Sequence, residues 1–247
     1  MKIFRSLLMV ISFSIFGVGS LAVGFLIFPF VNFLVKNNSK KLNTYSKIVY
    51  FSWNLFVKFL RIIGVLKLNI ENPNQLKSIK NSIIVSTHPS YIDVLILLSL
   101  IPNTTCFVAP RLTENKFFKK IVESMFLISG KPIQELQIDT EKMIKEGFNI
   151  LIFPSGVRHR KNEYPKIRKG AALVALNTKR NIIPIVMHTD IDFLQIGQPF
   201  YDAGEKPVTY TIKCNTEINI NKYLNYEDTV RQKKDLSNEI TNKLYEL

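Results

Sequence analysis

Residues 82–101 read SIIVSTHPSYIDVLILLSLI and change character at a single proline. Before it, Ser82 to Thr87 is an apolar, β-branched run with the composition of a buried strand. After it, Ser90 to Ile101 is long and apolar enough to form a helix. The residue before a proline avoids the α region, and proline is favoured at the first helical position, so Pro89 predicts that His88 lies just ahead of that helix. The stretch predicts one strand–loop–helix unit of an α/β sheet.

The alternation of strands and helices continues toward the C-terminus. Further strands are expected at Thr105–Ala109, Phe126–Ser129, Asn149–Phe153, Ile182–His188 and Val208–Cys214. Helices are expected at Asn115–Ser124, Ile138–Glu146, Lys169–Arg180 and, as a polar last element, Tyr226–Tyr245. Apolar strands that alternate with helices indicate a sheet covered on both faces. The fold class is therefore α/β, with a mostly parallel or mixed sheet flanked by helices.

The N-terminus has the composition of a membrane segment. Ser6 to Val35 contains no charged side chain, and this run exceeds the roughly 20 residues that cross a bilayer. We expect an N-terminal membrane helix, which Pro29 could kink. A cleaved signal peptide with Lys2 and Arg5 as its basic region is the alternative, but the apolar run is long for one.

A second, amphipathic helix is predicted at Tyr45–Leu68, where Lys47, Asn54, Lys58 and Arg61 fall on one stripe of a largely apolar surface. Such a helix suits the headgroup interface of a membrane, and a core helix with one wet face is the alternative. Asn69 to Lys80 is interpreted as a polar linker. The chain is thus divided into a membrane anchor with an interfacial helix, 1–68, and a main domain that ends in a helix, 69–247.

Charge and cysteine content narrow the class of protein. The formal net charge of +14 indicates an anionic partner, and the hydrophobic content of 47% favours a membrane or a phosphorylated substrate over nucleic acid. Cys106 and Cys214 lie far apart without a metal-binding pattern, so neither a disulfide framework nor a metal site is indicated.

Two groups of residues point to chemistry. If His88 precedes the helix and Asp93 lies in its first turns, the carboxylate can reach back to the imidazole and orient it as a general base. The second group follows the strand Asn149–Phe153, where Pro154 to Arg158 leads into a loop rich in Lys and Arg. Gly156 permits a tight turn and Arg158 offers donors suited to phosphate, so an anion-binding loop is expected here.

These residues resemble the glycerolipid acyltransferase family. His88, Ser90 and Asp93 match the H-x-S-x-x-D form of its first block, and residues 153–158, FPSGVR, resemble the F-P-E-G-T-R of its third. Residues 169–171, KGA, are similar to the segment that commonly follows, and 183–186, IPIV, to the fourth block. Ser155 departs from the family by replacing a glutamate. The second block, near 126–130, lacks its usual arginine, and Lys131 is the nearest cation.

The resemblance implies acyl transfer from acyl-CoA or acyl carrier protein to the hydroxyl of a lysophosphatidic acid-like acceptor, without a metal or an organic cofactor. It implies that His88 is the general base, that Asp93 orients it, and that the substrate-binding residues are Ser155, Gly156, Arg158, Arg160 and Lys131, with amides of the Gly156 turn as one source of oxyanion stabilisation. The partners would be a membrane lipid and the acyl donor, and the catalytic domain would face the cytoplasm. Another lysolipid or glycerol 3-phosphate as acceptor, or a lipid-binding protein without turnover, are the alternatives.

Overall fold

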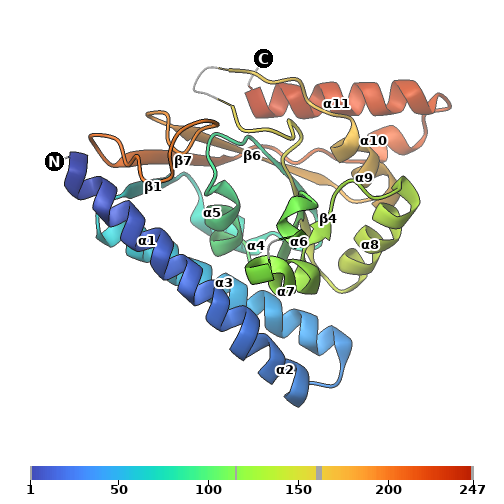
Figure 1. Cartoon of the computed structure of the whole chain (residues 1–247). Coiled ribbons are helices and arrows are strands. Elements are labelled where there is room, and N and C mark those ends of the chain that lie inside the picture. The colour runs from blue at the N-terminus through green and yellow to red at the C-terminus, as the bar shows by residue number, and fades with distance from the viewer. Residues whose placement is uncertain (1, 115, 160–162, 246–247) are drawn as a thin grey trace.

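The computed structural model describes residues 2–114, 116–159 and 163–245. Its centre is a seven-stranded sheet in the order β1-β7-β6-β2-β5-β3-β4, crossed by helices on both faces (Figure 1). The pairing is parallel throughout except between β6 and β7, so the predicted mixed α/β sheet is confirmed. The strands are β1 Leu66–Ile70, β2 Ile83–Ser86, β3 Thr104–Val108, β4 Leu127–Ile128, β5 Asn149–Ile152, β6 Ile182–Thr189 and β7 Val208–Cys214.

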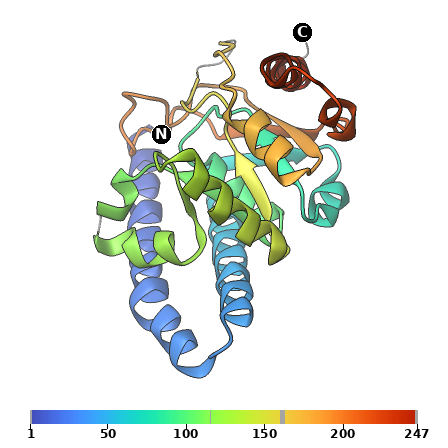
Figure 2. The ribbon, with the colours of Figure 1, turned by 90° about the vertical axis from the view of Figure 1, so that its right-hand side faces the viewer.

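Two apolar cores cover the two faces of the sheet. One core joins the sheet to α3 (Asn38–Ile62), α4 (Pro73–Ser78) and α5 (Asp93–Leu100). The other joins it to α8 (Ile133–Lys145), α9 (Gly170–Thr178), α10 (Asn221–Leu224) and α11 (Thr229–Tyr245). Figure 2 shows α9 and α11 on one side of the sheet and the N-terminal helices on the other. Because both faces are covered, β2 is buried along its whole length, and its first three residues, Ile83 to Val85, are all apolar.

The N-terminal segment forms one long apolar helix with a π-helical turn inside it. It runs as α1 (Lys2–Ala22), η1 (Val23–Ile27) and α2 (Phe28–Leu34), and Pro29 lies in the first turn of α2. The proline has no N–H to donate to the preceding turn, and a wider turn accommodates that loss. Ile3–Leu34 is long and apolar enough to cross a membrane, and 22% of its most apolar window is buried. Arg5 is held by the carbonyls of Gly64, Ala203 and Gly204.

The amphipathic helix begins earlier than predicted. One of its sides packs against the domain and the other is exposed. α3 starts at Asn38, capped by the Asn37 side chain, and returns antiparallel to α1 to form a helical hairpin (Figure 1). Its buried side packs on α5, where the Asn54 amide donates to the Ser99 carbonyl at 3.0 Å, so Asn54 does not belong to the wet stripe. The opposite side exposes large apolar residues and cations together, namely Phe51, Leu55, Ile62, Lys47, Lys58 and Arg61.

The expected linker at 69–80 is wrong. This segment contains the end of strand β1 and helix α4, which Pro73 begins. β1 pairs only with β7, and its alternating sequence LKLNI is that of an edge strand with one wet face, which is hard to distinguish from a polar connection. The boundary drawn between 68 and 69 therefore falls inside a strand of the sheet. Two further short helices were not predicted, α6 (Arg111–Glu114) and α10, whereas α7 (Lys116–Met125) was.

Asn149 ties together three chain segments at the amino end of the sheet. Its side chain is fully buried, accepts a hydrogen bond from the Ser82 amide and donates to the carbonyls of Ile79 and Pro102, each at 3.2 Å. Asn149 thus fixes where β2 and β5 begin relative to each other.

Asn149→Ala should lower the free energy of unfolding by about 3 kcal/mol, because several buried backbone groups lose their partner at once. Denaturant unfolding in detergent measures this change. Asn221→Ala, at an exposed position on α10, is the control and should stay within about 0.5 kcal/mol of the wild type. Equal stabilities of the two variants would contradict the assigned role of Asn149.

Candidate active site

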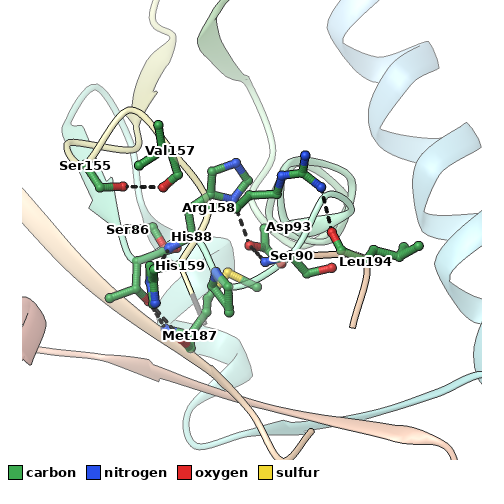
Figure 3. A network of polar contacts seen from close by, with 12 residues as sticks. Ser86, His88, Ser90, Asp93, Ser155, Val157, Arg158, His159, Met187 and Leu194 are labelled. Carbon is green, nitrogen blue, oxygen red and sulfur yellow. Dashed lines mark hydrogen bonds and ion pairs between the residues drawn. The ribbon is translucent and has the colours of Figure 1, made fainter. Parts of the chain in front are cut away.

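The site lies where two neighbouring strands end. β2 and β5 are adjacent and parallel, so the loops that leave their carboxyl ends meet at one edge of the sheet. The loop after β2 carries His88, and the loop after β5 carries residues 153–158. Figure 3 shows the two loops facing each other, with His88, Asp93 and Arg158 between them. The sequence separates these loops by more than sixty positions, and the strand pairing brings them together.

The predicted contact between His88 and Asp93 is present. His88 Nδ1 lies 2.8 Å from Asp93 Oδ2, and the Ser90 amide donates to the same oxygen at 2.7 Å. Pro89 is not the first residue of the helix as expected, because Ser90 to Ile92 form a turn and α5 begins at Asp93. This turn directs the carboxylate back toward the imidazole.

Burial and hydrogen bonding act against each other on Asp93. The carboxyl group is fully buried, and this loss of solvent raises its pKa, while the hydrogen bond and charge of His88 and the Ser90 amide oppose the rise. The His88 side chain is 17% exposed, so it connects the buried carboxylate to the surface. With Nδ1 directed at the Asp93 carboxyl group, the other ring nitrogen, Nε2, is the one left to accept a proton.

The His88 ring is also held from its face. Phe153, the residue after β5, stacks on the imidazole with ring centroids 4.2 Å apart and an interplanar angle of 25°. Phe153 also lines an apolar pocket of about 360 Å³ between α8 and α9. The other residues that line this pocket include Phe107, Leu136, Ile152, Ala171 and Val174.

The loop after β5 is a tight turn built from its own backbone. Ser155 is buried and its hydroxyl donates to the Val157 carbonyl at 2.8 Å. Gly156 has a left-handed backbone, φ +70°, and its amide donates to the Phe153 carbonyl at 2.9 Å. This amide is already used within the turn, so the oxyanion contact expected of the turn would come from another of its amides. A Cβ at Gly156 would lie 3.0 Å from the Arg168 guanidinium.

Arg158 points from this loop across the site. One guanidinium nitrogen donates to the Leu194 carbonyl at 2.6 Å, and the group lies over the Tyr91 ring at 5.4 Å. Its remaining donors are available to an anion. Leu194 has φ +53°, a conformation that a leucine rarely adopts. The loop after β6 thus orients Arg158. The side-chain amide of Gln195, from the same loop, donates to the Pro89 carbonyl.

His159, which the sequence analysis did not include among the site residues, also lies at the site. Its buried ring accepts a hydrogen bond from the His88 amide at Nε2, and its own amide donates to the His88 carbonyl, both at 3.1 Å. This reciprocal pair joins the two loops. Neither His159 nor the residues of the β6 loop carried a signal in the sequence, because their contacts are with backbone groups of distant segments.

One predicted site residue, Lys131, is not brought to this point. Lys131 pairs with Asp139 of α8 at 2.6 Å, and this carboxylate raises the pKa of Lys131. It follows β4, which is three strands from β2, or roughly 14 Å at ~4.8 Å per strand. Arg160 lies outside the described residues. Within the part of the chain that the structure describes, no group of three or more His, Cys, Asp or Glu side chains could hold a metal ion.

Comparison with known proteins agrees with this architecture. The family model described as Acyltransferase matches residues 67–188, which include both loops of the site. The crystal structure of the 1-acyl-sn-glycerophosphate acyltransferase PlsC from Thermotoga maritima superposes with a TM-score of 0.72, covering 100% of this chain and 99% of that one. The sequence identity is 15%, so this likeness concerns the fold.

Two curated relatives are similar in sequence. The human 1-acyl-sn-glycerol-3-phosphate acyltransferase beta is 24% identical over 158 residues, which cover 60% of this chain and 56% of the relative. A probable 1-acyl-sn-glycerol-3-phosphate acyltransferase of Mycoplasma pneumoniae is 28% identical over 181 residues, or 68% of this chain and 67% of the relative. The chain thus spans little more than half the length of the human protein.

Gly156→Ala should destabilise the protein by about 2 kcal/mol, because alanine is strained at positive φ and its Cβ would displace Arg168. Gly147→Ala is the matched control, since Gly147 has φ +84° and nothing within 4 Å of the added Cβ. It should cost only the backbone strain, about 1 kcal/mol. The difference between the two unfolding free energies measures the contact with Arg168, and a difference of zero would show that this contact is not tight.

Proposed function

Because this chain belongs to the acyltransferase family, we propose that it transfers a fatty acyl group from an acyl thioester to the hydroxyl of a lysophosphatidic acid-like acceptor. The observation that carries the proposal is the hydrogen bond between His88 and the buried Asp93 at the carboxyl end of the central strand. It supplies an oriented base that is open to solvent on one side, beside an arginine and an apolar pocket.

In the proposed reaction His88 Nε2 takes the proton of the acceptor hydroxyl as its oxygen attacks the thioester carbonyl. Asp93 holds the ring and stabilises the imidazolium that forms. The tetrahedral intermediate collapses, the C–S bond breaks, and His88 returns the proton to the departing thiolate. The oxygen–carbon bond replaces the carbon–sulfur bond, so no covalent enzyme intermediate, metal or organic cofactor takes part.

Charge and shape support the assignment of substrates. Arg158 keeps guanidinium donors free beside the site and would hold the acceptor phosphate, together with Arg160. Lys131 is too strongly engaged by Asp139 to contribute at this point, and it would act only on a more distant part of a substrate. The pocket behind Phe153 is apolar enough for a fatty chain, and it lies next to the base.

The source of the acyl group suggests which side of the membrane the α/β domain faces. The thioester is that of acyl-CoA or acyl carrier protein, both of which are made in the cytoplasm, so the α/β domain would face that side. The hairpin of α1, α2 and α3, with its exposed Phe51 and Leu55 beside Lys58, would keep the site at the membrane that contains the acceptor. The net charge of +14 suits an anionic membrane surface, and nucleic acid is not a partner.

His88→Ala should reduce acyl transfer by about 10³-fold, because it removes the base that activates the hydroxyl. A labelled acyl thioester is supplied with lysophosphatidic acid, other lysophospholipids or glycerol 3-phosphate, and labelled product is measured. His188→Ala is the control, since His188 is an exposed histidine on β6. Wild-type protein that acylates none of these acceptors would refute the proposal and favour a lipid-binding role.

Arg158→Lys should raise the KM for a phosphate-bearing acceptor about tenfold, because lysine cannot bind the phosphate and the Leu194 carbonyl with one planar group. The kcat should fall less. Arg231→Lys, at an exposed position on α11, is the matched control and should leave both constants unchanged. If Arg158→Lys changes kcat alone, Arg158 acts on the reacting atoms and not on the phosphate.

A further inference from the structure

The two carboxylate oxygens of Asp93 differ in their hydrogen bonding. Oδ2 accepts from both His88 and the Ser90 amide, whereas Oδ1, although buried, has no hydrogen-bond partner among the residues that the structure describes. The same is true of two other buried oxygens, the hydroxyls of Ser90 and Tyr210. A buried polar atom without a partner is costly, and for a carboxylate the cost is larger. Three such atoms at one catalytic pair call for a common explanation.

Tyr210 reaches this point from a part of the chain that the sequence did not connect with the site. It lies in the middle of β7, paired with Thr189 of β6 on one side and Leu68 of β1 on the other. Its side chain is fully buried and belongs to the same apolar core as the residues of α5, the helix that Asp93 begins. Tyr210 therefore belongs to the core on the face of the sheet that α5 covers, and its hydroxyl is a buried polar group within that core.

The three oxygens are near enough to act on one another. Burial raises the pKa of Tyr210 well above its ordinary value, the negative charge of Asp93 raises it further, and the nearby Ser90 hydroxyl opposes the rise. The titratable groups that face Asp93 are His88, from the loop before α5, and Tyr210, from β7. A tyrosine that keeps its proton is a donor, and an ionised carboxylate is only an acceptor, so the two complement each other.

We propose that Tyr210 is a positioning residue of the His88–Asp93 pair, which donates its hydroxyl proton to Oδ1 of Asp93 and accepts the hydroxyl proton of Ser90. This chain of two hydrogen bonds gives a partner to all three buried oxygens. It fixes the plane of the carboxylate, so that Oδ2 faces Nδ1 of His88. It also assigns a role to the serine of the H-x-S-x-x-D segment, which otherwise contacts Asp93 only through its amide.

The chain of hydroxyls also sets how tightly the pair binds a proton. A donor at Oδ1 spreads the negative charge of Asp93, so the imidazolium beside it is less stabilised than it would be next to a carboxylate without that donor. Removing the hydroxyl should therefore make the pair hold its proton to a higher pH. A tyrosine that only filled space in the core would not affect this property.

The first test follows the titration of the pair without requiring turnover. Full-length protein in detergent, labelled with ¹³C in its 3 histidines, is titrated by NMR as wild type, Tyr210→Phe and Tyr223→Phe, with His88→Ala to assign the His88 signal. In Tyr210→Phe the midpoint of the pair should rise by about one pH unit, the effect of losing a charge-assisted hydrogen bond. Tyr223, buried on α10 and bonded to Glu239, is the matched control and should leave the midpoint unchanged.

The second test rests on the proposed function and measures the pH dependence of acyl transfer. Tyr210→Phe should lower kcat about tenfold and move the acidic limb of the profile to higher pH, with KM changed less than about twofold. Ser90→Ala should shift the limb in the same direction by less, and the double variant should resemble Tyr210→Phe, because the two hydroxyls form one chain.

The outcomes separate the two proposals. If the NMR midpoint and the pH profile of Tyr210→Phe both match those of Tyr223→Phe, Tyr210 only packs the core and the inference is wrong. If the wild-type protein transfers no acyl group, the proposed function fails, and the NMR midpoint still decides whether Tyr210 serves Asp93. A higher midpoint in Tyr210→Phe supports the inference in either case.

Discussion

The parallel pairing of β2 with β5 is the contact on which the site depends. The register of Ile83 with Ile150 places the ends of both strands at the same height, so His88 and Phe153 meet in a stacked contact. A register shift of one residue would turn the apolar side chains of a strand toward the opposite face of the sheet, and here both faces are packed. Asn149 strengthens this register from the other end of the strands, through hydrogen bonds to the backbone on both sides of β5.

Every loop around His88 is held by backbone hydrogen bonds to another loop. His159 joins the β5 loop to the β2 loop, Gln195 joins the β6 loop to Pro89, and Arg158 joins the β5 loop to Leu194. Side chains that bind carbonyls and amides constrain the backbone without requiring a particular partner side chain. The rigidity of the site therefore comes from side chains that bind the backbone of a neighbouring loop, and His159 and Gln195 do so without a proposed contact to substrate.

The N-terminal hairpin and the site share one apolar core. Met9 of α1 and Phe56 of α3 belong to the core that also contains the helix begun by Asp93. An element with the composition of a membrane anchor is thus continuous with the packing around the His88–Asp93 pair. The exposed apolar residues of α3 lie on the side of the sheet that α3 and α5 cover.

The sequence by itself determined the α/β class, most of the strands and the His88–Asp93 contact, because each depends on local pattern: uniformly apolar runs form covered strands, and a proline fixes where a loop precedes a helix. It missed β1, whose alternating residues resemble a polar connection, and it placed Asn54 on the free side of α3, although this side chain contacts α5. Only the tertiary structure decided that the Gly156 amide is already used, that Lys131 pairs with Asp139, and that His159, Leu194 and Tyr210 surround the pair. These contacts join segments distant in the chain through backbone groups and single buried atoms, and such contacts leave no periodicity or spacing in the sequence.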